Sequence, residues 1–260
     1  MRINRTEVTQ AFERFASAYD TTDPKIALKI EHTLKVADLC NRISDSEGMS
    51  SAAGDVAWLS GMLHDIGRFE QLARYGTFSD ASSINHATLS ARLLFDDDLL
   101  SRFCNPNSLT DENIRALKTA IALHNAYELP ETLQPNEQIH CTVLRDADKK
   151  DLMRVMVESS ISTVISANEE SLRNSEVSPD VLQAFNERHA ILTAIKKTPA
   201  DFILGHCALG WELVYPESRL LALRQGYLAQ LFDKPFNSET TQAVFKNAKA
   251  SMFSWLQESA

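Results

Sequence analysis

Histidines and aspartates are spaced along the chain in a way that could build a metal site. His64 and Asp65 are adjacent, His32 lies earlier in the chain and Asp148 lies much later. Neutral imidazole and carboxylate are ligand types that suit manganese, iron, nickel and zinc. One carboxylate can also bridge two metal ions. The complete set of candidate metal ligands is His32, His64, Asp65, His86, His124 and Asp148.

Such a site could hydrolyse phosphate esters without a nucleophile from the protein. A divalent metal lowers the pKa of a bound water and polarises a phosphoryl oxygen, and two metals about 3.5–4 Å apart can clamp both reacting oxygens. The sequence has no Gly-x-Ser-x-Gly elbow, P-loop or paired-cysteine motif that would supply another mechanism. Arg68 and Lys149 are the best candidates for phosphate contact, and Arg145 and Lys150 are weaker ones. We expect Asp65, Arg68 and Lys149 to act in catalysis.

The order of these residues resembles the HD superfamily of metal-dependent phosphohydrolases. The run LHDIGR at 63–68 is similar to the family's His-Asp doublet followed by Ile-Gly-Lys/Arg, and DADK at 146–149 is similar to its closing motif. The resemblance covers residues 25–155. It favours Asp148 over Asp146 as the last ligand, because Asp148 directly precedes the basic residue. The resemblance implies an all-helical domain with a divalent metal bound by His32, His64, Asp65 and Asp148.

A second metal is implied by a further likeness. Some members of the superfamily, including the HD-GYP phosphodiesterases, carry extra histidines between the doublet and the last aspartate, and these hold a second metal. His86 and His124 stand in the corresponding places, which would make Asp65 the bridging carboxylate. The sequence departs from HD-GYP in having Asn125 after His124 and no Gly-Tyr-Pro triplet, so a cyclic-dinucleotide substrate is not implied. We expect one or two divalent ions per chain, chosen from Mn, Fe, Ni, Zn, Co and Mg.

Each candidate ligand also has a purely structural interpretation. A buried histidine such as His32 can be satisfied by a backbone carbonyl, and a buried Asp65 can form a salt bridge with Arg68. His86 could simply open a helix, and His124 near a helix C-terminus would be favoured there by the helix dipole. The ordered set favours a metal over these alternatives, which the sequence alone leaves open.

Several other residues have weaker functional interpretations. Asp80 either caps a turn or supports a metal ligand. The acidic run 96–98 lacks the alternating ligands and the glycine of a calcium loop, so a solvated helix end is expected there. The aromatic residues near the N-terminus are expected in the core; they are Phe12, Phe15 and Tyr19. Surface or core positions are expected for His140, His189 and His206.

Helices must position the candidate ligands. Eight glycines and eight prolines in 260 residues argue against a β-sandwich or barrel and for an all-α helical bundle with additional C-terminal helices. His32 shares an apolar stripe with Leu28 and Val36, so it should point inward. Gly67 should break or bend the chain after the doublet. Helices are expected at 6–19, 24–44, 50–64, 69–74, 86–95, 111–125 and 137–160, with three more helical runs from 178 onward.

The chain is expected to form one HD domain with additions at both ends. Residues 1–23 would form an N-terminal helix packed on the core, and 24–160 would form the domain itself. Residues 161–260 would form a C-terminal extension that completes the same domain or makes a lid. The helices of this extension could also provide the surface of a homodimer.

Composition limits the partners and the location. The net charge of −9 argues against a broad surface for nucleic acid or for an anionic membrane. The N-terminus is amphipathic rather than signal-like, and no apolar run approaches the roughly 18–20 residues of a membrane span. The four scattered cysteines suit a reducing compartment. A cytoplasmic location is therefore expected.

The function expected from the sequence is hydrolysis of a small phosphate ester, a phosphomonoester or a nucleotide, by water that the metal activates. One alternative is a non-catalytic HD module that binds a nucleotide or metal as a sensor, which an assay with manganese and generic phosphoesters would separate. Another is an HD-type di-iron oxygenase, which metal analysis and an iron-dependent spectrum would separate. A nuclease is disfavoured by the acidic balance.

Overall fold

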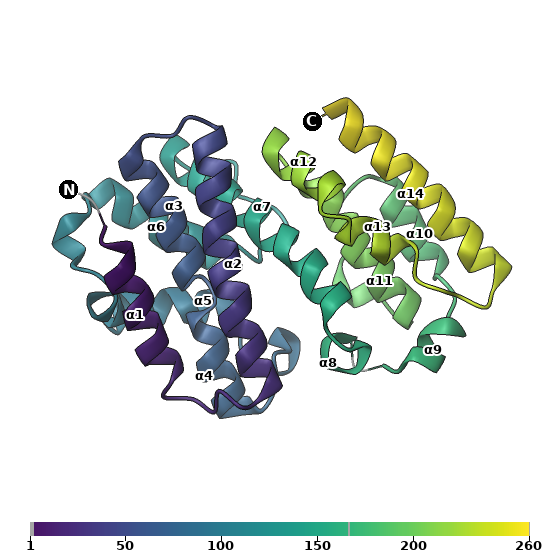
Figure 1. The fold of residues 1–260 in the computed structure, drawn as a ribbon, viewed down its shortest axis with the longest axis horizontal. Helices are drawn as coiled ribbons and strands as arrows, with labels where there is room; N and C mark the ends of the chain where they lie inside the picture. Colours follow the sequence, from purple (N-terminus) through teal and green to yellow (C-terminus); the bar gives the residue numbers. More distant parts are fainter. Residues whose placement is uncertain (1–2, 166, 260) are drawn as a thin grey trace. The chain divides into compact units, whose positions relative to one another are not determined.

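The fold is helical throughout the part of the chain that the structure describes. The computed structural model describes residues 3–165 and 167–259, and no strand occurs in them (Figure 1). The predicted all-α class is therefore confirmed. The chain divides into two compact units, Met1–Asp148 and Lys149–Ala260.

The N-terminal unit contains α1 to α6 and most of α7, which runs across the boundary between the units. The bounds of these helices are α1 Arg5–Ala16, α2 Pro24–Ser46, α3 Ser51–Leu63, α4 Ile66–Tyr75, α5 His86–Ala91, α6 Asp111–Leu123 and α7 Pro135–Glu158. The short helices are η1 Asp80–Ser82, the π-helix η2 Arg92–Asp96, η3 Leu99–Arg102 and η4 Pro106–Ser108. The helix expected at 86–95 is thus split, because α5 gives way to a π-helix.

Helices α2 and α3 lie side by side and carry two of the candidate ligands (Figure 1). α2 begins with Pro24, which follows the N-cap Asp23, so its start is well defined. Gly61 allows α3 to approach α2 closely, because a Cβ there would lie 2.6 Å from the backbone of α2. This close approach places His64, at the end of α3, beside the buried His32 of α2.

Gly67 lies inside the first turn of α4, which corrects the expectation that it would break the chain. α4 begins directly after the doublet, with Asp65 as its N-cap. The Gly67 amide donates a hydrogen bond to Ser90 Oγ at 2.8 Å, and a Cβ on Gly67 would lie 2.6 Å from the His86 carbonyl oxygen. The missing side chain therefore lets α5 lie against the start of α4, which brings His86 beside Asp65.

The N-terminal unit has its own apolar core. Phe12 of α1 is fully buried and packs edge-to-face on Phe69 of α4, with ring centroids 6.0 Å apart. Phe15 and Tyr19 are partly buried and pack against this core, as expected for the aromatic residues near the N-terminus.

The C-terminal unit has a separate core formed by short helices. Pro199 and Pro216 occupy the first turns of α11 and α12 rather than interrupting helices. Gly226 has a φ of 76° and separates α12 from α13, so the region from 178 onward holds more helices than the three expected runs. The helices of this unit are α8 Ile161–Ile165, α9 Glu169–Arg173, α10 Pro179–Asn186, α11 Pro199–Cys207, α12 Pro216–Arg224, α13 Tyr227–Phe232 and α14 Glu239–Ser259, with η5 Thr193–Ile195 and η6 Ala208–Glu212.

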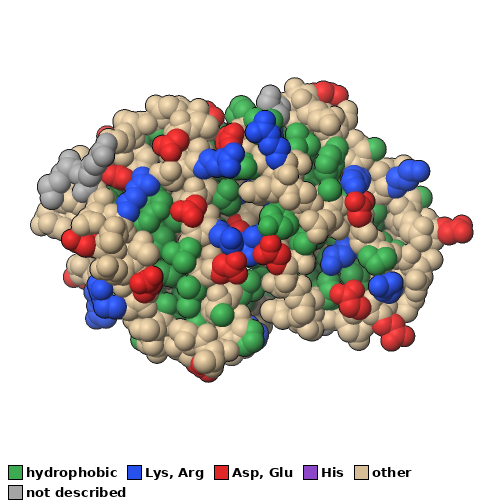
Figure 2. Space-filling model, in the orientation of Figure 1, with side chains coloured by type: hydrophobic (Ala, Val, Ile, Leu, Met, Phe, Trp, Pro, Cys, Tyr) green, Lys and Arg blue, Asp and Glu red, His purple; other side chains and the backbone are tan. Residues whose placement is uncertain are grey.

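The distribution of surface charge and the polarity of the helices are relevant to binding of nucleic acid or a membrane. Acidic and basic side chains are interspersed over the face drawn in Figure 2. Within the described ranges, every helix is too short or too polar to cross a membrane.

Candidate metal centre

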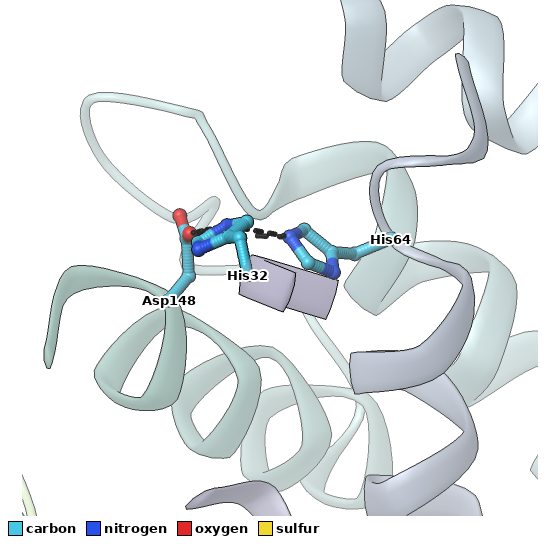
Figure 3. Close-up of side chains that lie close together, drawn as sticks. All are labelled: His32, His64 and Asp148. Carbon is cyan, nitrogen blue, oxygen red and sulfur yellow. Dashed lines mark hydrogen bonds and ion pairs between the residues drawn. The ribbon is translucent and has the colours of Figure 1, made fainter. Parts of the chain in front are cut away.

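His32, His64 and Asp148 meet inside the N-terminal unit, although they come from α2, the end of α3 and α7 (Figure 3). The Nε2 atom of His32 lies 3.1 Å from Asp148 Oδ1 and 3.4 Å from the Nε2 atom of His64. Both histidines are buried, and Asp148 is only slightly exposed. One ligand atom from each residue lies within 4.8 Å of the others, which is close enough for all to bind one ion.

Asp65 lies between this group and a second pair of histidines. Its Oδ2 atom is 3.7 Å from His32 Nε2 and 3.5 Å from His64 Nε2. Its Oδ1 atom is 3.5 Å from His86 Nε2 and 3.8 Å from His124 Nε2. One carboxylate therefore faces two pairs of imidazole nitrogens, one pair with each oxygen.

Backbone carbonyls fix the tautomers of two of these rings. His64 Nδ1 donates to the Gly61 carbonyl at 2.8 Å, and His124 Nδ1 donates to the Ile121 carbonyl at 2.8 Å. Burial lowers the pKa of His64, and burial together with the neighbouring His86 and His64 rings lowers that of His124 to about 3. Both rings are thus neutral at pH 7, with a lone pair on Nε2 directed into the cluster.

Asp80 orients the ring of His86. Asp80 Oδ2 lies 2.7 Å from His86 Nδ1, and the same carboxylate accepts hydrogen bonds from Gln71, Arg68 and Asn125. Burial opposes the charge on Asp80, but the hydrogen bond and charge of His86 outweigh it and lower the pKa to about 2. The sequence left open whether Asp80 caps a turn or supports a metal ligand. The structure shows Asp80 in contact with the candidate ligand His86. Such a contact is common around metal-binding histidines.

The donor set fits a divalent metal. His86 Nε2 lies 3.0 Å from His124 Nε2, so the two nitrogens are close enough to contact one ion. In addition, Asp65 Oδ1 is buried and has no hydrogen-bond partner among the described residues. Imidazole and carboxylate donors of this kind suit manganese, iron, nickel or zinc.

The HD domain family model matches residues 30–153, which include every candidate ligand. These residues belong to the HD-domain family. The HD superfamily comprises metal-dependent phosphohydrolases, so the expected resemblance is confirmed, and the residues that could hold a metal lie within the matched range. No curated protein and no solved structure shows a significant match to the chain.

Lys29 is a member of the HD domain's cluster that the sequence analysis did not single out. Its Nζ atom lies 2.7 Å from Asp65 Oδ2, and its side chain is 13% exposed. Burial opposes ionisation of Asp65, but the positive charge of Lys29 outweighs burial and holds the pKa of Asp65 well below its usual range. Lys29 precedes His32 by three residues on α2, and this spacing puts both on one helix face, which is the signal that could have identified it.

Arg68 contacts residues that surround the candidate metal cluster. Its guanidinium donates to Asp80 Oδ1 at 3.0 Å, to Gln71 Oε1 at 2.8 Å and to the Phe78 carbonyl at 2.5 Å. Its Nε atom lies 3.8 Å from Asp65 Oδ1. Arg68 therefore links the carboxylate that faces both histidine pairs to the carboxylate that orients His86.

The other predicted cations have different surroundings. Lys149 directly follows Asp148 and lies 3.7 Å from Glu212 Oε2 in the C-terminal unit. Lys150 is buried with its Nζ 5.4 Å from the centre of the Tyr227 ring, and burial lowers its pKa to about 8. Arg145 holds the end of α6 by donating to the carbonyls of Leu123, Ala126 and Tyr127.

The structure also locates the residues for which the sequence indicated only a weak functional role or none. Asp146 is buried, but Asp148 is the aspartate that lies with His32 and His64 in the cluster, as the resemblance implied. The run 96–98 is exposed at the end of the π-helix η2, as expected for a solvated end. His140 is buried in α7, His206 donates to the Phe202 carbonyl, and His189 lies 3.4 Å from Glu212.

Proposed function

We propose that the chain is a metal-dependent phosphohydrolase that acts on a small phosphate ester, either a phosphomonoester or a nucleotide. The observation that carries the proposal is the position of Asp65, with one oxygen facing each pair of histidines. A buried carboxylate oxygen without a hydrogen bond is costly unless a cation neutralises it, and a divalent ion on each side would do so.

The cluster divides into two groups of ligands around Asp65. His32, His64 and Asp148 would hold one ion, and His86 and His124 would hold a second. A divalent ion bound there supplies a lowered pKa for water and polarises a phosphoryl oxygen. Neither contribution requires a nucleophile from the protein.

Basic side chains near the cluster have two proposed roles: they bind the substrate, or they orient other side chains. Lys29 places a positive charge beside Asp65, where an anionic phosphate would approach, so we assign substrate binding to Lys29. Arg68 holds Asp80, and Asp80 accepts the Nδ1 proton of His86, so Arg68 acts here as a positioning residue. Lys149 stays a predicted phosphate contact, because it directly follows Asp148 in the sequence.

The experiment that tests the proposal is a substrate screen with added metal. The full chain is stripped with a chelator, reloaded separately with Mn²⁺, Fe²⁺, Co²⁺, Ni²⁺, Zn²⁺ or Mg²⁺, and assayed with nucleotides, sugar phosphates, p-nitrophenyl phosphate and its diester. We expect phosphate release only with metal, and its loss in Asp65→Asn. The matched control is Asp38→Asn, since Asp38 is an exposed aspartate of α2 and should leave activity unchanged.

Two results would overturn the proposal. Phosphate release that is equal in the wild type and Asp65→Asn would show that the cluster does not catalyse hydrolysis. Iron-specific consumption of dioxygen, with no phosphate released under any metal, would assign the site to oxygenase chemistry instead.

A further inference from the structure

A cavity in the N-terminal unit lies apart from the metal cluster, between α1, α4 and the segment from η2 to η3. Its volume is about 430 Å³, within the range of roughly 300–1,000 Å³ that is usual for small-molecule sites. None of the candidate metal ligands lines it. The cavity is therefore a separate feature that the proposed hydrolysis does not use.

One wall of the cavity is aromatic and aliphatic. Phe15 lies with its ring centroid 5.7 Å from that of Phe103 and 5.3 Å from that of Tyr19. Leu93 and Leu99 also line the cavity. Packed rings lose little freedom when a ligand binds, so this wall is suited to an apolar or aromatic body.

The acidic side chains that line the cavity have partners within the protein, whereas the basic ones have none in the described part of the chain. Glu70 accepts hydrogen bonds from Tyr19 Oη at 2.8 Å and from Arg74 Nε at 2.7 Å, so both of its oxygens have partners. Asp97 Oδ2 lies 3.7 Å from Arg92 Nε. The guanidinium groups of the two arginines that line the cavity, Arg14 and Arg102, have no ion pair or hydrogen bond with any residue that the structure describes.

The backbone beside the cavity is irregular. Leu93 belongs to a π-helix, and Asp98, between η2 and η3, has a φ of 57° in the left-handed region. Both features cost conformational energy and occur frequently at functional sites.

We propose that this cavity binds an amphipathic organic anion. The apolar body would pack on Phe15, Leu99 and Phe103, and the anionic group would accept hydrogen bonds from Arg14 and Arg102. A guanidinium binds carboxylate, sulfate and phosphate groups through paired hydrogen bonds, so the recognised chemistry is an anionic head on an apolar body.

Helix α4 connects this cavity with the metal cluster. Asp65 is the N-cap of α4, and Glu70 on the same helix lines the cavity. A ligand in the cavity would therefore contact the helix that positions Asp65.

Titration calorimetry with sodium octanoate tests the proposal. The full chain is measured with a chelator present, so that the metal cluster cannot bind the carboxylate. We expect Arg14→Gln combined with Arg102→Gln to weaken octanoate binding about tenfold or more, because two charge-assisted hydrogen bonds are lost. Arg115→Gln is the matched control, since Arg115 is an exposed arginine of α6 that does not line the cavity.

A second variant blocks the cavity without changing its charge. Ala18 lines the cavity and is exposed, so Ala18→Phe should fold normally, as circular dichroism and the melting temperature would show. We expect Ala18→Phe to abolish octanoate binding, and octyl sulfate to bind the wild type as octanoate does.

Three results would overturn the proposal. One is no octanoate binding to the wild type, or binding that Ala18→Phe leaves intact. Another is equally tight binding of 1-octanol, which would remove the role of the anion. The third is a wild-type dimer in sedimentation that Ala18→Phe dissociates, which would assign the cavity to a second copy of the chain.

Discussion

Lys29 Nζ lies 2.7 Å from Asp65 Oδ2, so the carboxylate that faces both histidine pairs has a lysine as its closest cationic partner in the described residues. Lys29 is mostly buried, and it is the largest of the charges that keep Asp65 ionised against the cost of burial. In the metal-free chain the lysine offsets part of the charge that a metal would otherwise neutralise.

Replacing Lys29 should therefore destabilise the metal-free chain. We expect Lys29→Met to lower the free energy of unfolding by about 3 kcal/mol, because it leaves a buried carboxylate without its partner. Saturating Mn²⁺ should stabilise this variant more than it stabilises the wild type. Urea unfolding with and without Mn²⁺ measures both effects. Lys35→Met is the control, since the Lys35 pair with Glu31 is exposed and should contribute less than about 1 kcal/mol.

The two histidine pairs should differ in their effect on metal content. His86→Ala combined with His124→Ala should reduce the bound metal from two ions to one per chain, because His32, His64 and Asp148 keep the other group intact. His32→Ala should weaken the ion held by that group. Elemental analysis of the purified variants, loaded with Mn²⁺ and then desalted, gives the number of ions. Unchanged content in the double variant would remove the second ion while leaving the first.

The contact between Asp80 and His86 should tune metal affinity. Asp80→Asn keeps the shape of the side chain but offers His86 Nδ1 a weaker, neutral acceptor or a donor in its place. We expect the affinity for Mn²⁺ to fall about 10–100-fold, as is typical when a carboxylate that supports a metal-binding histidine is lost. Calorimetric titration of the metal-free protein measures this change. Asp38→Asn, which removes an exposed carboxylate of α2, should leave the affinity unchanged.

The candidate ligands could be predicted from the sequence because local rules govern most of them. Helical periodicity puts His32 on an inward stripe, and the doublet at a helix end directs His64 and Asp65 into the same interior. Asp80 follows no such rule, and the helical spacing that puts Lys29 on the face of His32 does not by itself indicate a contact with Asp65. Asp80 lies in a 3-10 turn, where no periodicity indicates a direction, and a lysine one turn from a histidine is usually solvated.

The roles of the glycines also depend on contacts between residues that are distant in the chain. A glycine can end a helix or allow a close approach of two helices, and the sequence does not distinguish the two uses. Gly67 does the second, and the atoms that show it belong to His86 and Ser90, which lie much later in the chain. Gly76, by contrast, has a φ of 68° and ends α4 as a turn-forming glycine should.

His140 should make the stability of the chain depend on pH. It is fully buried in α7, and neither ring nitrogen has a hydrogen-bond partner within the described residues. Burial lowers its pKa to about 4, against about 6.5 in the unfolded chain. The unfolded state therefore binds the proton first, so the stability present above pH 6.5 is lost as the pH falls toward 4.

The substitution His140→Leu removes both the unpaired nitrogens and the titration. We expect it to be neutral or stabilising at pH 7.5, because an apolar side chain of similar size no longer buries unsatisfied polar atoms. At pH 4.5 the advantage should grow by up to about 3 kcal/mol, since the wild type alone must keep the proton off a buried ring. Urea unfolding of both proteins at the two pH values gives the comparison. An equal loss of stability on acidification in both would mean that other groups, and not His140, carry the pH dependence.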